Sequence, residues 1–331
     1  MTPITMTPTH SPFNHIVAFE VSKDSLVVHV LPADKQRTIA NTPASVRRLL
    51  RAETVRNRKA ALGSLLVVCE ATGGYERHVL AAAQELALAC HRAHGSRVRF
   101  FARYLGLAAK TDAIDARMLA LYGLKTERLR LYEPPSAEEA TLRELKARRD
   151  EIRDMLVAES NRLDHASHRS VLAGLKAHIR ALRACLASLD KEIAELLRTA
   201  PALARKAWLM QTVIGIGPQT AAACLAYMPE LGRLTKAEAA ALAGLAPIAN
   251  DSGKSSAPRR TGHGRAPIRR TLYMAAVVAC HRNPIIAAFA QRLRQSGKPF
   301  KVVITAVMRK LIVILNAILH DDQPWRHAKT T

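Results

Sequence analysis

The sequence predicts a mixed α/β domain followed by a helical arm and an all-helical C-terminal domain. Its 331 residues suffice for roughly two domains. Short apolar runs alternate with helical patterns as far as about residue 130, whereas the hydrophobic period is purely helical beyond the break at residues 133–136. The apolar share of 49% and the charged share of 23% are ordinary for a protein that buries a core, which argues against wholesale disorder.

The first part of the chain contains four predicted strands and two predicted helices. The strands are residues 15–20, 25–31, 65–70 and 97–102. The helices are residues 75–89 and a segment from residue 111 onward, with Thr111 or Asp112 as its N-cap. Strands interleaved with helices predict a mixed sheet flanked by helices.

A leucine-rich seam follows the break. Apolar residues alternate at spacings of three and four along residues 172, 175, 179, 182, 186, 189, 193 and 196. A weaker seam runs through residues 142, 145, 152, 156 and 163. The two seams predict an antiparallel helical hairpin of coiled-coil type that Pro201 ends. It is either a dimerisation arm, since an exposed leucine seam would be a liability, or a solvated spacer within one subunit.

The helical segment from about residue 205 to 319 opens with a glycine-rich turn, residues 214–218. This turn resembles a helix-hairpin-helix, in which the backbone N–H groups of Gly215 and Gly217 would hold a DNA phosphate. A tight turn between two helices is the alternative. The longest apolar tract, residues 302–319, is interrupted by Arg309 and Lys310, which predicts a buried helix and no membrane span.

The charge balance predicts a polyanionic partner. Fifty Lys and Arg against 27 Asp and Glu give a net charge of +23, and the commonest polyanion in a cell is nucleic acid. Aromatic residues are only 4%, which argues against single-strand stacking sheets of the cold-shock or RRM kind. Five widely spaced cysteines without a CxxC pair indicate neither disulfides nor zinc and fit a reducing cytosol, and no signal peptide is seen.

The basic residues concentrate where acidic residues are absent. Residues 252–320 contain thirteen Lys and Arg and no Asp or Glu. Solvated faces normally mix both signs, so this segment, called here the acid-free segment, predicts contact with a phosphate backbone. The residues expected to make that contact, besides Gly215 and Gly217, are Lys254, Arg259, Arg260, Arg265, Arg269 and Arg270.

Four carboxylates occupy positions that protein cores avoid. Glu20 and Glu70 end predicted strands, and Asp112 and Asp115 lie three residues apart in the first turns of a predicted helix. Hard oxygen ligands of this kind suit Mg²⁺ or Mn²⁺, and such ions can stabilise the oxygens of phosphodiester cleavage. Alternatively, the aspartates cap a helix and Glu70 is an ordinary strand end. Separately, Ser252 lies in a polar loop, where it is either a nucleophile toward phosphorus or a turn residue.

Six segments together resemble one known family. They are VAFEVSKDSL at 17–26, VVCEATGGY at 67–75, KTDAIDARMLA at 110–120, VIGIGPQTAAACLAY at 213–227, LAGLAPIANDSG at 242–253 and IRRTLYMAA at 268–276. In this order and spacing the chain resembles the DEDD-type transposases of the insertion sequence one-ten family, the bridge-RNA-guided recombinases. The resemblance covers residues 15 to 320.

The resemblance implies a domain plan. A disordered N-terminus, 1–14, would precede an RNase H-like, RuvC-like metal domain, 15–132. A coiled-coil arm, 137–200, would lead to a helical transposase domain with a catalytic serine, 205–320, and a tail, 321–331. The family's glutamate matches Glu70, its paired aspartates match Asp112 and Asp115, and its serine matches Ser252.

The chain departs from the family pattern at three positions. The first-strand aspartate is Glu20, a further aspartate is Val27, and the proline before the first glycine of the turn is Ile214. Glutamate keeps the charge but reaches one methylene further, which a metal site would have to accommodate.

The function implied by the resemblance is Mg²⁺-dependent strand exchange between donor and target double-stranded DNA. Ser252 would form a transient phosphoserine in a composite site of a homodimer or tetramer, in the cytoplasm and without a membrane. A structured guide RNA would select both DNAs. Two alternatives are a metal-dependent junction-type nuclease, which needs neither Ser252 nor the arm, and a catalytically impaired nucleic-acid-binding relic, which the replacement at Glu20 motivates.

Overall fold

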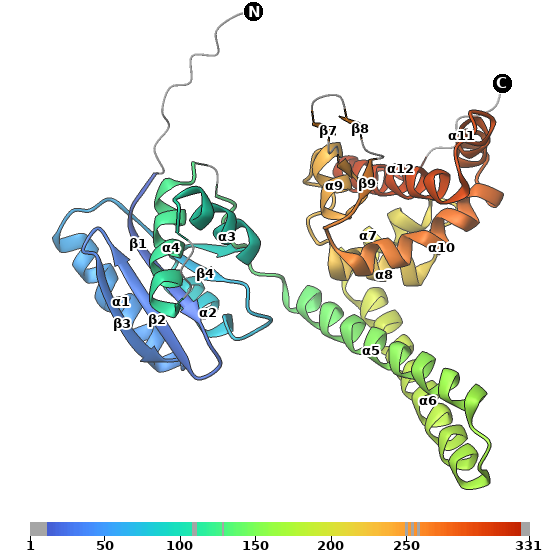
Figure 1. The fold of residues 1–331 in the computed structure, drawn as a ribbon, viewed down its shortest axis with the longest axis horizontal. Helices are drawn as coiled ribbons and strands as arrows, with labels where there is room; N and C mark the ends of the chain where they lie inside the picture. Colours follow the sequence, from blue (N-terminus) through green and yellow to red (C-terminus); the bar gives the residue numbers. More distant parts are fainter. Residues whose placement is uncertain are drawn as a thin grey trace, which may run out of the picture. The chain divides into compact units, whose positions relative to one another are not determined.

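The fold was analysed in a computed structural model that describes residues 12–107, 111–127, 129–248, 251–252, 255–256 and 259–325. Lys254 therefore lies outside the described residues, as do most of the N-terminus and the end of the tail. The chain divides into two compact units, Met1–Pro134 and Pro135–Thr331, here called the N-terminal and C-terminal units (Figure 1).

A five-stranded mixed sheet forms the centre of the N-terminal unit. Its strands are β1 (Phe13–Val21), β2 (Ser25–Leu31), β3 (Lys35–Ala40), β4 (Ser64–Glu70) and β5 (Ala89–Ala93), in the spatial order β3-β2-β1-β4-β5. The first three strands pair antiparallel, and β4 and β5 continue from β1 in parallel. Because side chains alternate along a strand, each strand contributes side chains to both faces of the sheet.

Two helices cover each face of this sheet. Helices α1 (Pro43–Lys59) and α2 (Arg77–Glu85) share a core with Val17, Phe19 and Val21 of β1. Helices α3 (Gly95–Tyr104) and α4 (Asp112–Lys125) share the opposite core with Ile16 and Ala18 (Figure 1). The even-numbered positions of β1 therefore face α3 and α4.

Most of the sequence predictions for this unit are confirmed, but two are wrong. Strands 15–20, 25–31 and 65–70 exist as β1, β2 and β4, and Thr111 caps α4 by accepting a 3.2 Å bond from the backbone N–H of Ile114. Residues 97–102 form α3 instead of a strand, because Val98 and Phe101 both point inward at helical spacing. The helix expected over 75–89 is shorter, α2 at Arg77–Glu85, and its last expected residue, Ala89, begins the unpredicted strand β5.

Strand β3 was not predicted, and its pattern explains why. It lies at the edge of the sheet, and five of its six residues are exposed, so no alternation of apolar side chains marks it. Its pairing with β2 decides its conformation.

The C-terminal unit begins with the predicted helical hairpin. A capping box at Ser136 starts α5 (Ala137–His165), and α6 (Arg169–Thr199) returns alongside it (Figure 1). All eight apolar residues of the α6 seam are buried or partly buried. The pairing of Arg149 with Asp190, and of Glu159 with His178, shows that the helices run antiparallel. The seam is therefore covered within one chain and does not by itself require a second copy.

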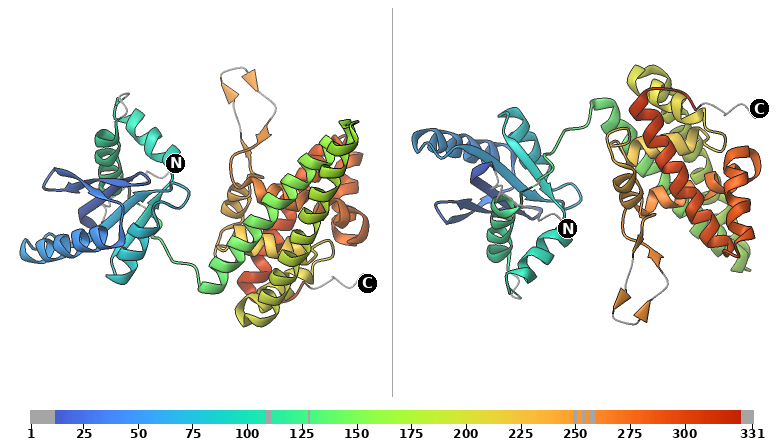
Figure 2. Two further views of the ribbon diagram at one scale, coloured as in Figure 1. Left: turned by 90° about the horizontal axis from the view of Figure 1, so that it is seen from below. Right: turned by 90° about the horizontal axis from the view of Figure 1, so that it is seen from above.

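Six further helices build the largest core of the chain. They are α7 (Pro201–Gln211), α8 (Pro218–Tyr227), α9 (Lys236–Leu242), α10 (Ala266–Arg282), α11 (Pro284–Gln295) and α12 (Phe300–Asp321). The expectation of an all-helical domain is wrong in one detail. Two small antiparallel pairs lie between α9 and α10: β6 (Pro247–Ile248) with β9 (Arg260–Thr261), and β7 (Asp251–Ser252) with β8 (Ser255–Ser256). Figure 2 shows them projecting from the helices.

Helix α12 carries the longest apolar tract. By length and composition it could cross a membrane, as could the strongly bent pair α10 and α11 taken together. Half of the apolar window of α12 is buried inside the unit, and Val303, Val307, Leu311 and Leu315 belong to its core. This packing agrees with the prediction of a buried helix.

Candidate functional site

Glu20 and Glu70 lie side by side at the carboxyl ends of two parallel strands. Phe19 of β1 pairs with Cys69 of β4, so the next residues along both strands are neighbours. Both glutamates continue the even-numbered positions of their strands, which point to the face that α3 and α4 cover. Both are partly buried, and the Oε2 atom of Glu20 is shielded from solvent. The sheet register thus brings two of the predicted carboxylates together.

The Glu70 carboxylate sits against the first residue of α3. A Cβ added at Gly95 would overlap the Oε1 atom of Glu70, so the glycine leaves room for the carboxylate in this orientation. The amino terminus of a helix carries partial positive charge, which favours a carboxylate at this position. Gly95 is therefore part of the geometry that places Glu70, and its role was not predicted.

Asp112 and Asp115 lie in the first turn of α4, where Asp112 is exposed and Asp115 is half-buried. Helix α4 packs on β1, β2 and β4, the part of the sheet that holds Glu20 and Glu70. Within the described ranges, however, no three His, Cys, Asp or Glu side chains are grouped closely enough to hold a metal ion. The expected convergence of all four carboxylates is thus not seen.

Glu76 organises the loop that follows Glu70. This buried carboxylate accepts bonds from the backbone N–H of Gly74 at 2.8 Å and from the Thr72 hydroxyl at 3.0 Å, and it pairs with Arg92 of β5. Burial by itself would raise the pKa of Glu76. Its own backbone N–H, that of Gly74 and the Arg92 guanidinium outweigh burial and hold the pKa below the ordinary value.

Asn41 ties together the loops that follow both glutamate-bearing strands. Its buried amide donates to the carbonyl of Ser22 at 2.9 Å, just after β1, and to that of Tyr75 at 3.0 Å, after β4. Sequence analysis missed Asn41 and Glu76, because nothing local distinguishes them from surface residues. The only local signal was the Gly73–Gly74 pair beside Glu76, whereas Asn41 lies ten residues beyond the nearest predicted strand, 25–31.

The predicted nucleophile lies in the C-terminal unit. Ser252 belongs to β7 and pairs in register with Ser255 of β8, while Asp251 pairs with Ser256. The backbone of this pair is thus an antiparallel hairpin at the start of the acid-free segment. Ser252 belongs to the C-terminal unit and the four carboxylates to the N-terminal unit, so their joint action is a proposal about assembly.

Three of the predicted phosphate-binding arginines have partners inside the fold. Arg265 forms a two-pronged pair with Glu230, at 2.6 and 2.7 Å, and also donates to a backbone carbonyl. Arg269 donates to the carbonyl of His263, and Arg270 pairs with Asp154 of α5 at 3.1 Å. Arg259 and Arg260 are exposed. Arg265 joins the start of α10 to the end of α8 and the residues that follow it, and the phosphate contact of these arginines stays a prediction.

The glycine turn between α7 and α8 has two glycines with different roles. Gly215 has a φ of +105°, and a Cβ there would come within 2.7 Å of the Cβ of Ala279 on α10. At Gly217 nothing lies within 4 Å of such a Cβ. Gly215 thus serves close helix packing, whereas Gly217 caps α8 and is exposed. A hollow of about 620 Å³ lined by residues 214, 277, 278, 281 and 282 adjoins this turn.

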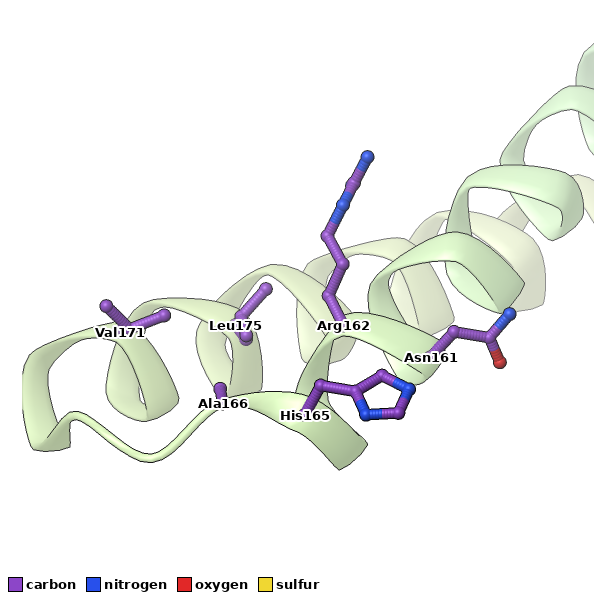
Figure 3. Close-up of a pocket in the computed structure, with 6 residues that line it drawn as sticks. All are labelled: Asn161, Arg162, His165, Ala166, Val171 and Leu175. Carbon is purple, nitrogen blue, oxygen red and sulfur yellow. The ribbon is translucent and has the colours of Figure 1, made fainter.

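A second hollow, of about 390 Å³, lies at the tip of the α5–α6 hairpin. Asn161, Arg162, His165, Val171 and Leu175 line it together with Ala166, and Figure 3 shows them gathered around the turn. None of the predicted functional residues lies here.

Comparison with known proteins decides the family. The "Transposase IS116/IS110/IS902 family" model matches residues 207–291, and a second transposase model, of the IS110 DEDD type, matches residues 17–168. The pilin gene-inverting protein of Moraxella bovis is 32% identical over 232 residues, which is 69% of this chain and 71% of that protein. The chain belongs to the IS110 family of transposases.

Other relatives agree with this assignment. The pilin gene-inverting protein of Moraxella lacunata matches at the same identity and coverage. An uncharacterized 42 kDa protein of insertion element IS900 from Mycobacterium paratuberculosis is 32% identical over 96 residues, 28% of this chain and 23% of that protein. This IS110-family transposase is therefore a DNA-binding recombination enzyme of a mobile element, and its DEDD family typically uses a divalent metal ion.

Proposed function

We propose that this IS110-family transposase exchanges DNA strands through Ser252, with Glu20, Glu70, Asp112 and Asp115 as ligands of Mg²⁺ or Mn²⁺. The observation that carries the proposal is the juxtaposition of Glu20 and Glu70 at the carboxyl ends of β1 and β4. Two partly buried carboxylates on adjacent strands repel each other unless a cation or a proton neutralises one of them. The order of the five strands supports the RNase H-like domain that the resemblance implies.

The donor set fits a hard divalent ion. All four side chains offer only carboxylate oxygens, and helix α4, which carries both aspartates, packs over the strands that carry both glutamates. A bound ion would stabilise negative charge that develops on a DNA phosphate. The third and fourth ligands would join on assembly with DNA, since no three of these side chains group closely within the described residues.

Ser252 would act as the nucleophile of a transesterification. Its Oγ forms a bond to phosphorus, the bond from phosphorus to one DNA oxygen breaks, and the hydroxyl proton passes to that leaving oxygen. A hydroxyl of the exchanged strand then attacks the phosphoserine and returns the proton to Oγ. A serine hydroxyl is a weak nucleophile at neutral pH, so the step depends on charge stabilisation around the phosphate.

The acid-free segment would bind the phosphates of donor and target double-stranded DNA. A structured guide RNA would select both DNAs, and a homodimer or tetramer in the cytoplasm would bring the serine of one subunit to the carboxylates of another. Arg259 and Arg260 follow the Ser252 hairpin in the chain, at the start of β9, and both are exposed. Their position supports this assignment.

A metal-dependent junction-type nuclease and an impaired nucleic-acid-binding relic are the second candidates. Two observations favour the relic: Glu20 stands where the family pattern has aspartate, and no three ligands group within the described residues. The nuclease needs the same carboxylates as the recombinase. The nuclease would cut with water and leave Ser252 unused.

The deciding experiment traps a covalent protein–DNA adduct with suicide DNA substrates that carry the element's ends. Ser252→Ala should abolish the adduct and strand exchange while keeping DNA affinity, because the hydroxyl carries no charge. Ser255→Ala and Ser256→Ala are the matched controls. DNA cleavage by all three variants would establish the nuclease. Loss of the adduct in Ser255→Ala or Ser256→Ala alone would identify that serine as the nucleophile.

The Glu20 replacement is tested in the same assay. Glu20→Asp should raise Mg²⁺-dependent exchange if the longer side chain holds the ion imperfectly. Isothermal titration of Mn²⁺ into the DNA complex gives a readout independent of activity. A chain that binds no divalent ion, as wild type or as Glu20→Asp, would be a relic.

A further inference from the structure

Helix α3 presents two aromatic side chains to solvent. Phe100 is 67% exposed and Tyr104 is 84% exposed, and their spacing of four residues places them next to each other on one helix face. Large aromatic rings are rarely left this bare on a soluble protein unless they contact a partner. The hydrophobic cores of the N-terminal unit account for neither ring.

Positive charge surrounds this aromatic pair. Arg97 and Arg103 each lie three residues from Phe100, and Arg99 is exposed on the same helix. No Asp or Glu occurs between Ala93 and Thr111. The helix itself therefore combines rings with guanidinium groups and carries no acid that would repel a phosphate.

The inner side of α3 holds this face in a fixed orientation. Val98 is buried, and Phe101 packs edge-on against Tyr122 of α4, with ring centroids 5.6 Å apart. At the start of the helix, Gly95 touches the Glu70 carboxylate. A ligand lying along α3 would therefore lead directly to the candidate carboxylates.

We infer that α3 binds an unpaired nucleic-acid strand, whose bases stack on Phe100 and Tyr104 and whose phosphates contact the flanking arginines. Unpaired strands expose base faces that rings can stack on, whereas a duplex hides them. A ten-residue helix with three arginines matches this ligand by charge and by shape. The inference goes beyond the proposed strand exchange, because it requires neither Ser252 nor a metal ion.

The test measures binding of the full chain to labelled oligonucleotides of about 20 nucleotides, as oligothymidine, oligouridine and a blunt duplex. Phe100→Ala with Tyr104→Ala should weaken single-strand binding about tenfold or more, since each stacked base contributes that much. Duplex binding should change less than about twofold, because the acid-free segment carries it. Comparing the two single strands tells DNA from RNA as the preferred source.

Two further variants separate stacking from apolar contact. Phe100→Leu with Tyr104→Leu keeps apolar surface but removes the rings, and it should lose single-strand affinity as the alanine pair does. Trp208→Ala removes a half-exposed aromatic ring from the C-terminal unit outside the acid-free segment, and it should change the affinity for neither ligand. Equal losses on duplex and single strand, or wild-type binding by the leucine pair, would overturn the inference.

A third measurement uses only wild-type protein, so the misfolding of a variant cannot affect its result. Photo-crosslinking of wild-type protein to an oligonucleotide with 5-iodouracil should attach it to Phe100 or Tyr104. Crosslinks confined to other helices would contradict the inference. Loss of binding to anionic lipid vesicles in the alanine pair, with oligonucleotide binding intact, would assign the face to a membrane surface instead.

Discussion

At the residue scale, single side chains shape the neighbourhood of the candidate carboxylates. Glu76 accepts hydrogen bonds from the loop after β4 and neutralises the charge of Arg92. Asn41 connects that loop to the one after β1. Neither residue carries chemistry, yet each fixes the backbone beside Glu20 or Glu70. Their substitution is expected to change both stability and the placement of the carboxylates.

We expect Glu76→Gln to destabilise the N-terminal unit by about 2–4 kcal/mol, because it leaves Arg92 without its buried counter-charge. The folded-state pKa of Glu76 is lowered, so its stabilisation is present above the ordinary value of 4.5 and is lost as pH falls through the lower folded value. Wild type should therefore lose stability below about pH 4.5 more steeply than the variant. Calorimetry across pH measures this, with the exposed Glu127→Gln as control.

The glycine turn gives a second prediction at this scale. Gly215→Ala should destabilise the C-terminal unit by about 1–3 kcal/mol, since its Cβ would press on Ala279 and its φ is positive. Gly217→Ala meets open space and should cost less than about 1 kcal/mol. Both tryptophans, Trp208 and Trp325, lie in this unit, so their fluorescence during urea unfolding reports it alone. A larger loss of DNA affinity for Gly217→Ala would support the phosphate-binding interpretation of the turn.

At the element scale, polar pairs attach the helical hairpin to the helices behind it. Asp190 of α6 receives Arg149 at 2.5 and 3.2 Å and also accepts from Gln219 of α8 at 2.8 Å. Desolvation alone would raise the pKa of Asp190, but the Arg149 hydrogen bond and charge lower it. This cluster links the arm to the first turn of α8, directly after the glycine turn.

Double-mutant cycles should rank two ion pairs that the hairpin forms, one between α5 and α6 and one from α5 to α10. We expect a coupling energy of about 1–2 kcal/mol between Arg149 and Asp190, which are partly buried and bond in two places. Arg270 and Asp154 are both more than half exposed, so their coupling should stay below about 0.5 kcal/mol. Urea unfolding followed by tryptophan fluorescence measures both cycles. Equal coupling energies would contradict the expectation that solvent weakens the exposed pair more than the partly buried one.

At the scale of the whole molecule, the charge of +23 dominates nucleic-acid binding. If six or more phosphates are neutralised, affinity for duplex DNA should fall by about three orders of magnitude between 50 and 200 mM salt. Arg282, Arg294 and Lys298 are exposed in the acid-free segment. Their triple alanine variant should lower the slope of log affinity against log salt by about two to three.

The matched control removes the same charge from the other unit. Arg48, Arg58 and Lys59 are exposed on α1, and their triple alanine variant has the same net charge. It should leave the salt slope unchanged within about one. If both triple variants reduced the slope equally, binding would follow net charge and not the acid-free segment.

The amino-acid sequence alone determined the division into a mixed α/β part and a helical part, the hairpin, the excess of positive charge and the family. These features follow from periodicity, composition and motif order, which are local properties of the chain. Residues 97–102 were expected as a strand and form part of α3, and the strand at 89–93 was not expected, because a short run fits both periods until its packing partners are known. The low aromatic content likewise concealed the pair on α3, since composition averages over the chain and exposure does not.

Only the tertiary structure decided which residues meet. The parallel register of β1 and β4 brings together Glu20 and Glu70, fifty positions apart, and Gly95 makes room for one of them. In the folded chain Arg265 forms an ion pair with Glu230, and helix α5 packs against the leucine seam of α6. Long-range pairing determines these contacts because each partner lies tens of residues away, where no local pattern carries information about it.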